Sequence, residues 1–252
     1  ARVLRTSLRF FIAFALIFGV SAPANAHFPV NLTASHHTVA KSPILIDGTI
    51  SFAVYANFTA PKQQRHVRFA LQPGDQLNVE YLIVDQAPTN KLKKSQLPSV
   101  TVTTPSGKKI ALPIKERTAF FEPYGKKNYF FLSRISQSGE AGIYSIRAQS
   151  KARSSVVIAI GRTETRGEIL TVGQSPEQCP ITIKGEEEIT QDRASQLIGM
   201  SERAAEVCAA ANGWLYRVGE RDGEQFAVTL DFRPNRVTVS VASAMITKVD
   251  IG

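Results

Sequence analysis

The sequence predicts two domains, an all-β antiparallel sandwich followed by a small α+β domain. Short segments with alternating apolar residues fill the first part, and a helical apolar period followed by further strands marks the last part. The charge also changes: residues 27–175 contain 19 Lys and Arg against 9 Asp and Glu, whereas residues 176–252 contain 8 against 12. Such a shift favours a domain boundary. We expect the sandwich over 27–165, a linker over 166–180 and the α+β domain over 181–252.

Residues 1–26 have the three regions of a secretory signal peptide. An arginine-rich start and an apolar run over 10–20 precede Ala24-Asn25-Ala26, which is a small-x-small cleavage site. The apolar run is too short to span a membrane, and no later stretch is apolar enough to do so. We therefore expect a secreted or periplasmic protein that starts at His27 after cleavage and has no membrane span.

The predicted sandwich consists of short strands separated by turn sequences. Gln72-Pro73-Gly74-Asp75 and Thr104-Pro105-Ser106-Gly107 are two such turns. Apolar residues alternate or cluster in segments 50–58, 66–71, 77–83, 99–103, 110–114, 130–132, 143–148 and 155–160. Strands of this length and spacing are typical of an antiparallel β-sandwich, and no helical period interrupts them.

Three stretches of this region carry a resemblance to known modules. They are Arg68-Phe69-x-Leu71-x-x-Gly74-Asp75-x-Leu77, then Gly142-Ile143-Tyr144-Ser145, and the closing strand over 156–161. In these features the region resembles secreted β-sandwich modules of the jelly-roll or pre-peptidase C-terminal type. A shared fold implies no particular activity, so we expect only a targeting or binding module here.

The two cysteines of the chain, Cys179 and Cys208, both lie near or within the predicted second domain. An even number of cysteines in an exported protein favours a disulfide bond, and two unpaired buried thiols are the alternative. The segment before Cys179 is rich in Thr, Gly, Ser and Pro without a long apolar period, so we interpret it as the linker.

The predicted second domain contains a well-marked helix. Apolar residues recur from position 204 to 211 at helical spacing, Ser201 supplies an N-cap, and Asn212-Gly213 supplies a stop, so a helix is expected over 202–211. A short helix or turn is expected before it over 190–198. Strands are expected at 214–218, 236–241 and 245–251, with an irregular extended segment over 226–235.

This irregular segment carries the most informative motif of the chain, Val228-Thr229-Leu230-Asp231-Phe232-Arg233-Pro234-Asn235-Arg236-Val237. It resembles the reactive-site loop of the potato inhibitor I and eglin family of serine-protease inhibitors. It is also similar to a bacterial and fungal peptidase inhibitor family that often has Arg-Pro-Asp/Asn-Arg in the loop. The flanks agree, with Leu197-Ile198-Gly199 before the helix and Ile246-x-x-Val249-x-x-Gly252 in the final strand.

The resemblance implies an inhibitor whose loop binds a protease as a substrate does. Its scissile bond would be Leu230–Asp231, and Leu230 would fill the primary pocket of a subtilisin-like, chymotrypsin-like or elastase-like serine protease. The implied reactive loop comprises Ala227, Val228, Thr229, Leu230, Asp231, Phe232 and Arg233.

The resemblance also implies how the loop is supported. Arg236 and Asn235 are the implied supporting residues, with Arg236 bonded to both Thr229 and Asp231. The family's usual second supporting arginine is replaced by Thr238, so one brace is expected to be missing. The related bacterial inhibitors often have a cysteine just before the final glycine, where this chain has Ile251; this leaves Cys179 and Cys208 to pair with each other.

Other readings of the sequence remain open. The chain is alternatively a non-inhibitory envelope or extracellular binding protein whose function lies in the sandwich. A third reading is a copper site formed by His27 with His36, His37 or His66. No Ser/His/Asp or Cys/His set has recognisable flanks, and no glycine-rich phosphate loop is present, so we expect no enzyme activity, no cofactor and no resident metal. An exported chain without an aromatic-basic motif is not expected to bind nucleic acid.

Overall fold

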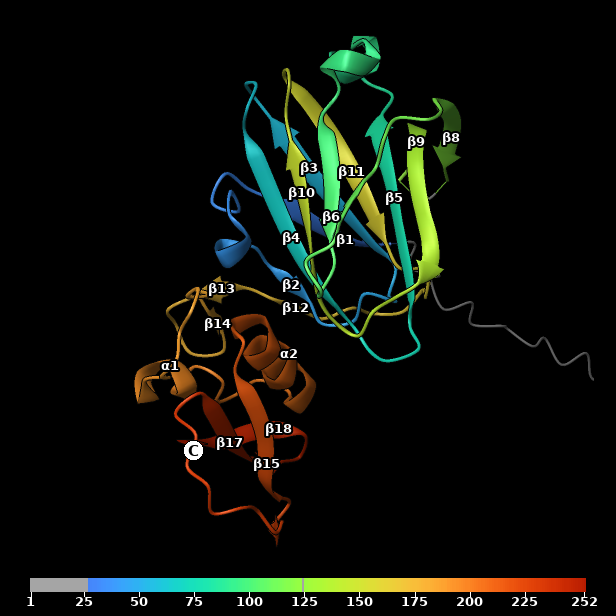
Figure 1. Cartoon of the computed structure of the whole chain (residues 1–252). Helices are drawn as coiled ribbons and strands as arrows, with labels where there is room; N and C mark the ends of the chain where they lie inside the picture. The colour runs from blue at the N-terminus through green and yellow to red at the C-terminus, as the bar shows by residue number, and fades with distance from the viewer. Residues whose placement is uncertain (1–26, 124) are drawn as a thin grey trace, which may run out of the picture.

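The computed structural model of the protein describes residues 27–123 and 125–252, so the predicted signal peptide lies outside the described residues. Two six-stranded sheets lie face to face, and a smaller unit with two helices and a four-stranded sheet lies below them (Figure 1). Within the described ranges, no helix combines the length and the hydropathy needed to cross a bilayer. The fold is therefore mostly β and sandwich-like, as the alternation predicts.

The strands of the two large sheets come from widely separated parts of the chain. The first sheet contains, in spatial order, β1 Phe28–Leu32, β3 Phe52–Phe58, β11 Ser154–Ile160, β5 Gln76–Val84, β9 Lys127–Ser138 and β8 Thr118–Glu122. The second contains β12 Ile169–Leu170, β2 Ile44–Leu45, β4 Gln64–Leu71, β10 Gly142–Gln149, β6 Ser99–Thr103 and β7 Lys109–Ala111. Three short 3₁₀ turns connect strands: η1 Val39–Lys41, η2 Thr89–Lys91 and η3 Lys94–Gln96.

The sandwich core forms because each central strand points alternate side chains inward. Phe52, Val54 and Tyr81 from the first sheet meet Phe69 and Tyr144 from the second, and all five are almost fully buried. The rings of Phe69 and Tyr144 stack with their centroids 4.9 Å apart. Each Å² of apolar surface that is buried stabilises the fold by about 25 cal/mol. This inner layer is therefore the main stabilising feature of the sandwich.

The sandwich is not wholly antiparallel, which corrects the prediction. β1 pairs in parallel with β3, and β2 pairs in parallel with β4. Alternation shows which side of a sheet a residue faces but carries no information about the direction of the neighbouring strand. In addition, β9 extends well beyond the expected 130–132, and β8 beside it has no clear alternation that would have predicted it.

The C-terminal unit has the expected order of helix, strand, loop, strand and strand. It contains α1 Gln191–Ser195, α2 Glu202–Asn212, β15 Leu215–Arg221, β16 Glu224–Gln225, β17 Arg236–Ala242 and β18 Met245–Ile251. The Ser201 hydroxyl accepts a hydrogen bond from the Ala204 amide at 3.1 Å, and Gly213 ends α2 in the left-handed region. β15 is parallel to β17, whereas β17 and β18 are antiparallel. The parallel pair requires a crossover, which the irregular segment 226–235 provides.

The expected linker is folded against its neighbours rather than free. Residues 166–180 contain β12, which pairs with β2 of the second sheet, and the paired strands β13 Val172–Gly173 and β14 Cys179–Pro180. Cys179 is bonded to Cys208 with a Cα–Cα distance of 5.6 Å, which confirms the disulfide bond. The composition predicted a linker because strands of two residues are too short to show an apolar period.

The sandwich and the C-terminal unit share an apolar cluster. Ile44 and Ala70 from the second sheet lie in the same buried cluster as Leu197 and Ala205 from the C-terminal unit. Beside it, the fully buried Arg68 donates a hydrogen bond to the Thr182 hydroxyl at 2.8 Å and two to Ser42. Contact of this kind couples the stability of the two parts.

The shared cluster predicts that both parts unfold in one transition. Trp214, the single tryptophan of the chain, lies buried in the C-terminal unit, so its fluorescence reports on that unit, whereas far-UV circular dichroism is dominated by the sandwich. The urea midpoints of unfolding measured by fluorescence and by circular dichroism should therefore coincide. Ile44→Ala should lower the free energy of unfolding by about 2–5 kcal/mol for both signals. Truncation of the exposed Ile183 to Ala is the control and should change stability by less than about 0.5 kcal/mol. Two separate transitions would contradict the coupling.

Candidate functional site

The segment 226–235 forms an exposed loop at the lower edge of the C-terminal unit in Figure 1. Both ends are fixed by backbone hydrogen bonds: Phe226 donates to the Gly219 carbonyl at 2.9 Å, and Leu215 donates to the Asn235 carbonyl at 2.9 Å. Asn235 therefore supports the loop through its backbone carbonyl. The loop is irregular in secondary structure, but its start and end are held on β15.

The loop presents large apolar side chains to solvent. Leu230 is 102 % exposed and Phe232 is 72 % exposed, and Ala227 and Val228 are exposed as well. Side chains of this kind gain about 1.5–3 kcal/mol each when they are fully buried, so their exposure leaves that free energy available for contact with a partner. Leu230 lies at the position that the family resemblance assigns to the primary pocket.

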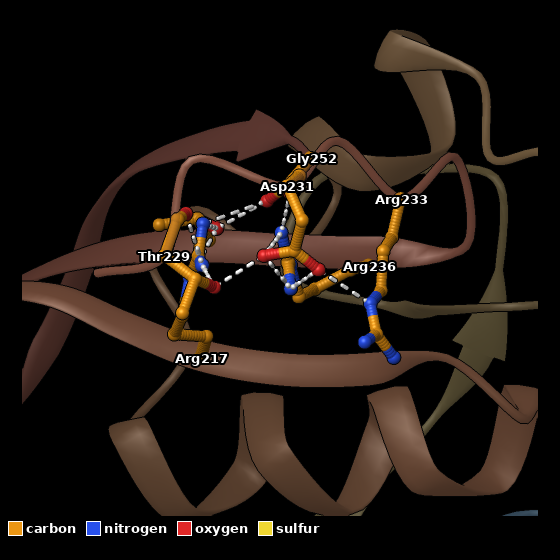
Figure 2. Close-up of polar contacts among 7 residues, drawn as sticks. Arg217, Thr229, Asp231, Arg233, Arg236 and Gly252 are labelled. Atoms are coloured by element: carbon orange, nitrogen blue, oxygen red, sulfur yellow. Dashed lines mark hydrogen bonds and ion pairs between the residues drawn. The ribbon is translucent and has the colours of Figure 1, made fainter.

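Arg236 holds the backbone on the C-terminal side of Leu230, at Asp231. Its side chain is only 8 % exposed, and one guanidinium nitrogen lies 3.3 Å from the Asp231 carboxylate, while another donates to the Asp231 carbonyl oxygen (Figure 2). Arg233 reaches the same carboxylate at 2.7 Å but is 56 % exposed. The expected contact between Arg236 and Asp231 is therefore present. The expected bond from Arg236 to Thr229 is replaced by a different donor.

That donor is Arg217 on β15, which the sequence motif did not indicate. Its Nη1 donates to the Thr229 carbonyl at 3.2 Å and approaches the Thr229 hydroxyl at 3.3 Å. Its Nε and Nη2 donate to the Thr238 hydroxyl at 3.1 and 3.0 Å, and Nη2 also reaches the Gly252 carbonyl at 3.1 Å (Figure 2). The brace expected to be missing at position 238 is thus supplied from the neighbouring strand.

The pairing of β15 with β17 explains this replacement. Arg217 lies directly beside Thr238 in the parallel register, so its long side chain passes over the small threonine toward the loop. An arginine at both positions would place two cations side by side, whereas a hydroxyl accepts the guanidinium donors. The linear sequence offers no signal for this contact, because Arg217 is an ordinary polar residue of a predicted strand.

The end of β18 also packs under the loop. Thr238 donates through its hydroxyl to the Gly252 carbonyl at 2.6 Å, and Gly252 donates to the Arg236 carbonyl at 2.9 Å. A Cβ atom at Gly252 would lie 2.9 Å from the ring of Phe232, and Gly252 has a φ of +125°. A larger residue there would therefore displace Phe232 and strain the backbone.

The electrostatics of the loop centre on Asp231. Its carboxylate accepts a hydrogen bond from the hydroxyl of Thr229, the residue on the other side of Leu230 (Figure 2). It also accepts hydrogen bonds from the guanidinium groups of Arg233 and Arg236. These hydrogen bonds hold the pKa of the Asp231 carboxyl well below its usual value of 3.8. The carboxylate therefore stays ionised and keeps accepting hydrogen bonds from both sides of the loop.

This pKa shift predicts that the loop keeps its hydrogen bonds in acid. A lowered folded-state pKa means that the stabilisation is complete above about pH 3.8 and is lost only as the pH falls through the lower folded-state value. Carbon-detected NMR should find Asp231 ionised between pH 7 and pH 3. Thr229→Val removes one of the three donors and should raise the titration midpoint of Asp231 toward 3.8. If Asp231 of the wild-type protein titrates with a midpoint at or above 3.8, its carboxylate is not held by these hydrogen bonds.

The histidines proposed for copper are not gathered into a metal site. Within residues 27–123 and 125–252, no group of three or more His, Cys, Asp or Glu residues is placed to hold a metal ion. The His27 ring contacts the Ser51 hydroxyl, and His37 contacts the Ala34 carbonyl at 3.1 Å. The structure therefore gives the copper reading no geometric support.

Comparison with protein-family models and with curated proteins finds no match to this chain. Its function therefore has to be inferred from the loop itself. Of the residues named from the sequence, Thr229, Asp231 and Arg236 meet in one hydrogen-bonded group, which Arg217 and Gly252 complete. Leu230 projects from this group into solvent.

Proposed function

We propose that this protein is a serine-protease inhibitor in which residues 227–233 form a substrate-like loop with Leu230–Asp231 as the scissile bond. One observation carries the proposal. The two residues that flank Leu230 are held from below by two different arginines, Thr229 by Arg217 and Asp231 by Arg236. Leu230 itself is fully exposed between them. A stiff backbone around a free apolar side chain is what substrate-like inhibition requires.

Two physical consequences of this arrangement support inhibition over simple cleavage. An extended loop can pair with the edge of a protease cleft by β-augmentation, and a loop already held in shape loses little conformational entropy on binding. After attack on the Leu230 carbonyl, the new amino group of Asp231 stays close because Arg236 holds that residue. The Thr229 side stays in place because of Arg217. Rejoining of the bond then competes with hydrolysis and release.

The side chains of the loop suggest the class of target. Leu230 suits a primary pocket that accepts a large aliphatic group, as in subtilisin-like, chymotrypsin-like or elastase-like enzymes. We propose that the protein acts outside the cytoplasm, as a secreted or periplasmic inhibitor. The arginine-rich apolar leader and the disulfide bond support this location. The sandwich then serves to position the inhibitor.

Progress curves with the full chain test the proposal. The full chain is needed because the C-terminal unit shares its apolar cluster with the sandwich. Subtilisin, chymotrypsin or elastase should show inhibition at micromolar concentration or below, and mass spectrometry of the recovered inhibitor should find slow cleavage between Leu230 and Asp231. Absence of inhibition of all three enzymes at micromolar concentration would disprove the proposed function.

A further inference from the structure

The outer face of the first sheet is hollowed at two adjoining places. One hollow of about 450 Å³ lies next to η2, and a second of about 410 Å³ lies over the middle of the sheet. Tyr55 on β3 lines both of them, so they form one continuous depression across the strands, here called the outer groove. Volumes of this size are typical of ligand sites.

Aromatic rings line the central part of the outer groove. Tyr55, Phe120, Tyr129 and Phe131 gather there on the outward side of the strands. The rings of Phe120 and Phe131 lie 5.1 Å apart, and the Tyr55 and Tyr129 hydroxyl oxygens are 3.5 Å apart. Tyr129 is buried among them, whereas the other three rings are half-buried. Outward positions of an antiparallel pair are usually polar, so three partly exposed rings on this face indicate a surface adapted for contact.

Amide side chains line the other part of the outer groove. They belong to Asn31, Asn57, Gln86 and Asn128. The backbones of Asn57 and Asn128 accept hydrogen bonds, but the four amide groups make none to other residues within the described ranges. Each amide offers two donor hydrogens and one acceptor oxygen. Glu80, half-buried at the ring end of the groove, adds an acceptor with no ion pair among the described residues.

We infer that the outer groove binds a chain of neutral sugars. A sugar ring has an apolar C–H face, which packs against an aromatic ring, and a rim of hydroxyl groups, which both donate and accept hydrogen bonds. Rings beside free amides match these two properties, because neutral amides exchange hydrogen bonds with hydroxyls in both directions. Lys127 at the groove is outnumbered by the carboxylates of Asp85, Glu80 and Glu122, so the lining favours a neutral sugar chain over an anionic one. Two adjoining hollows suit an oligosaccharide longer than one residue.

This site is separate from the inhibitory loop. The turn η2 beside the first hollow belongs to the green segment at the top of Figure 1, whereas the loop lies at the lower edge of the C-terminal unit. The two sites share no residue, so a polysaccharide bound in the groove would leave the loop uncovered. Sugar binding goes beyond the proposed inhibition and does not depend on it.

Affinity electrophoresis of the full chain tests the inference. The chain is basic, with a pI of about 9.7, so it is run toward the cathode in native gels that contain hydroxyethylcellulose, xylan, mannan or glycol chitin. At least one of these polysaccharides should retard the wild-type protein. Tyr55→Ala, which removes the ring shared by both hollows, should weaken that retardation at least about tenfold, which corresponds to about 1.4 kcal/mol.

Phe121 supplies the matched control. It is an exposed ring on the same strand as Phe120 but lines neither hollow, so Phe121→Ala should be retarded like the wild type. Circular dichroism checks that each variant is folded. If Tyr55→Ala does not fold, Asn57→Ala decides the matter, because its amide is exposed and its loss should also reduce retardation. No retardation by any of the four polysaccharides, or equal retardation of the groove variants and Phe121→Ala, would overturn the inference.

Discussion

Leu230→Arg is expected to reverse the target preference of the proposed inhibitor. An apolar primary pocket would have to accept a guanidinium without a partner, at a cost of several kcal/mol. Binding to subtilisin and chymotrypsin should therefore weaken by roughly 100-fold or more, since each 1.4 kcal/mol corresponds to a factor of ten. A protease with an acid at the base of its pocket gains a charge-assisted pair instead, so trypsin should become the better target.

Inhibition constants for subtilisin, chymotrypsin and trypsin measure this reversal. Ile198→Arg is the matched control, because Ile198 is another exposed aliphatic residue of the same unit but lies outside the loop. It should leave all three constants unchanged. If Leu230→Arg leaves the preference as it is in the wild type, Leu230 does not occupy the primary pocket, and the assignment of the scissile bond is wrong.

Arg236→Ala and Arg217→Ala are expected to turn the proposed inhibitor into a substrate. Both variants keep Leu230 and thus the pocket contact, but each frees one side of the bond. Arg236→Ala releases the side chain and carbonyl of Asp231, and Arg217→Ala releases Thr229 together with its link to Gly252. Charge-assisted hydrogen bonds contribute about 1.5–3 kcal/mol each, so loss of either brace should accelerate cleavage and release roughly 10- to 150-fold.

The fraction of inhibitor cleaved after incubation with subtilisin, measured by mass spectrometry, reports on both braces. Arg203→Ala is the control, since Arg203 forms an exposed ion pair with Glu206 on α2 and such pairs contribute little. Arg233→Ala should have a smaller effect than Arg236→Ala because Arg233 is 56 % exposed. Unchanged inhibition by Arg217→Ala would mean that the contact to Thr229 does not stiffen the loop.

The two braces are also expected to act together. Arg217 and Arg236 are linked through the loop, because the Thr229 hydroxyl that Arg217 contacts donates to the Asp231 carboxylate that Arg236 binds. Removal of either arginine side chain therefore leaves the other arginine in contact with a less fixed loop residue. A double-mutant cycle on the cleavage rates of the single and double variants should then give a coupling free energy different from zero.

Local features of this fold could be read from the sequence because their causes lie within a few residues. The helix α2 begins just after Ser201 and ends just before Gly213, since a hydroxyl cap and a left-handed glycine act on adjacent backbone groups. The inward residues of β3, β4 and β5 follow from alternation. The disulfide bond follows from an even number of cysteines in a chain whose first residues predict export.

Features that depend on neighbours in space were missed or misread. The parallel partners of β1 and β2 are invisible to alternation, because a strand shows the same period in either direction. The expected linker is an ordered part of the sheets, because pairs of two residues are stabilised by the strands beside them and not by their own composition.

The sequence by itself determined the irregular segment 226–235, and the family that its motif resembles implied an exposed Leu230 and a contact between Arg236 and Asp231, because these residues lie within one short motif. Only the tertiary structure decided what replaces the second arginine. Arg217 is separated from Thr238 by 21 residues and reaches it because β15 and β17 pair in parallel. Side chains that meet across paired strands are set by register, and register is a property of the folded sheet that neither strand carries alone.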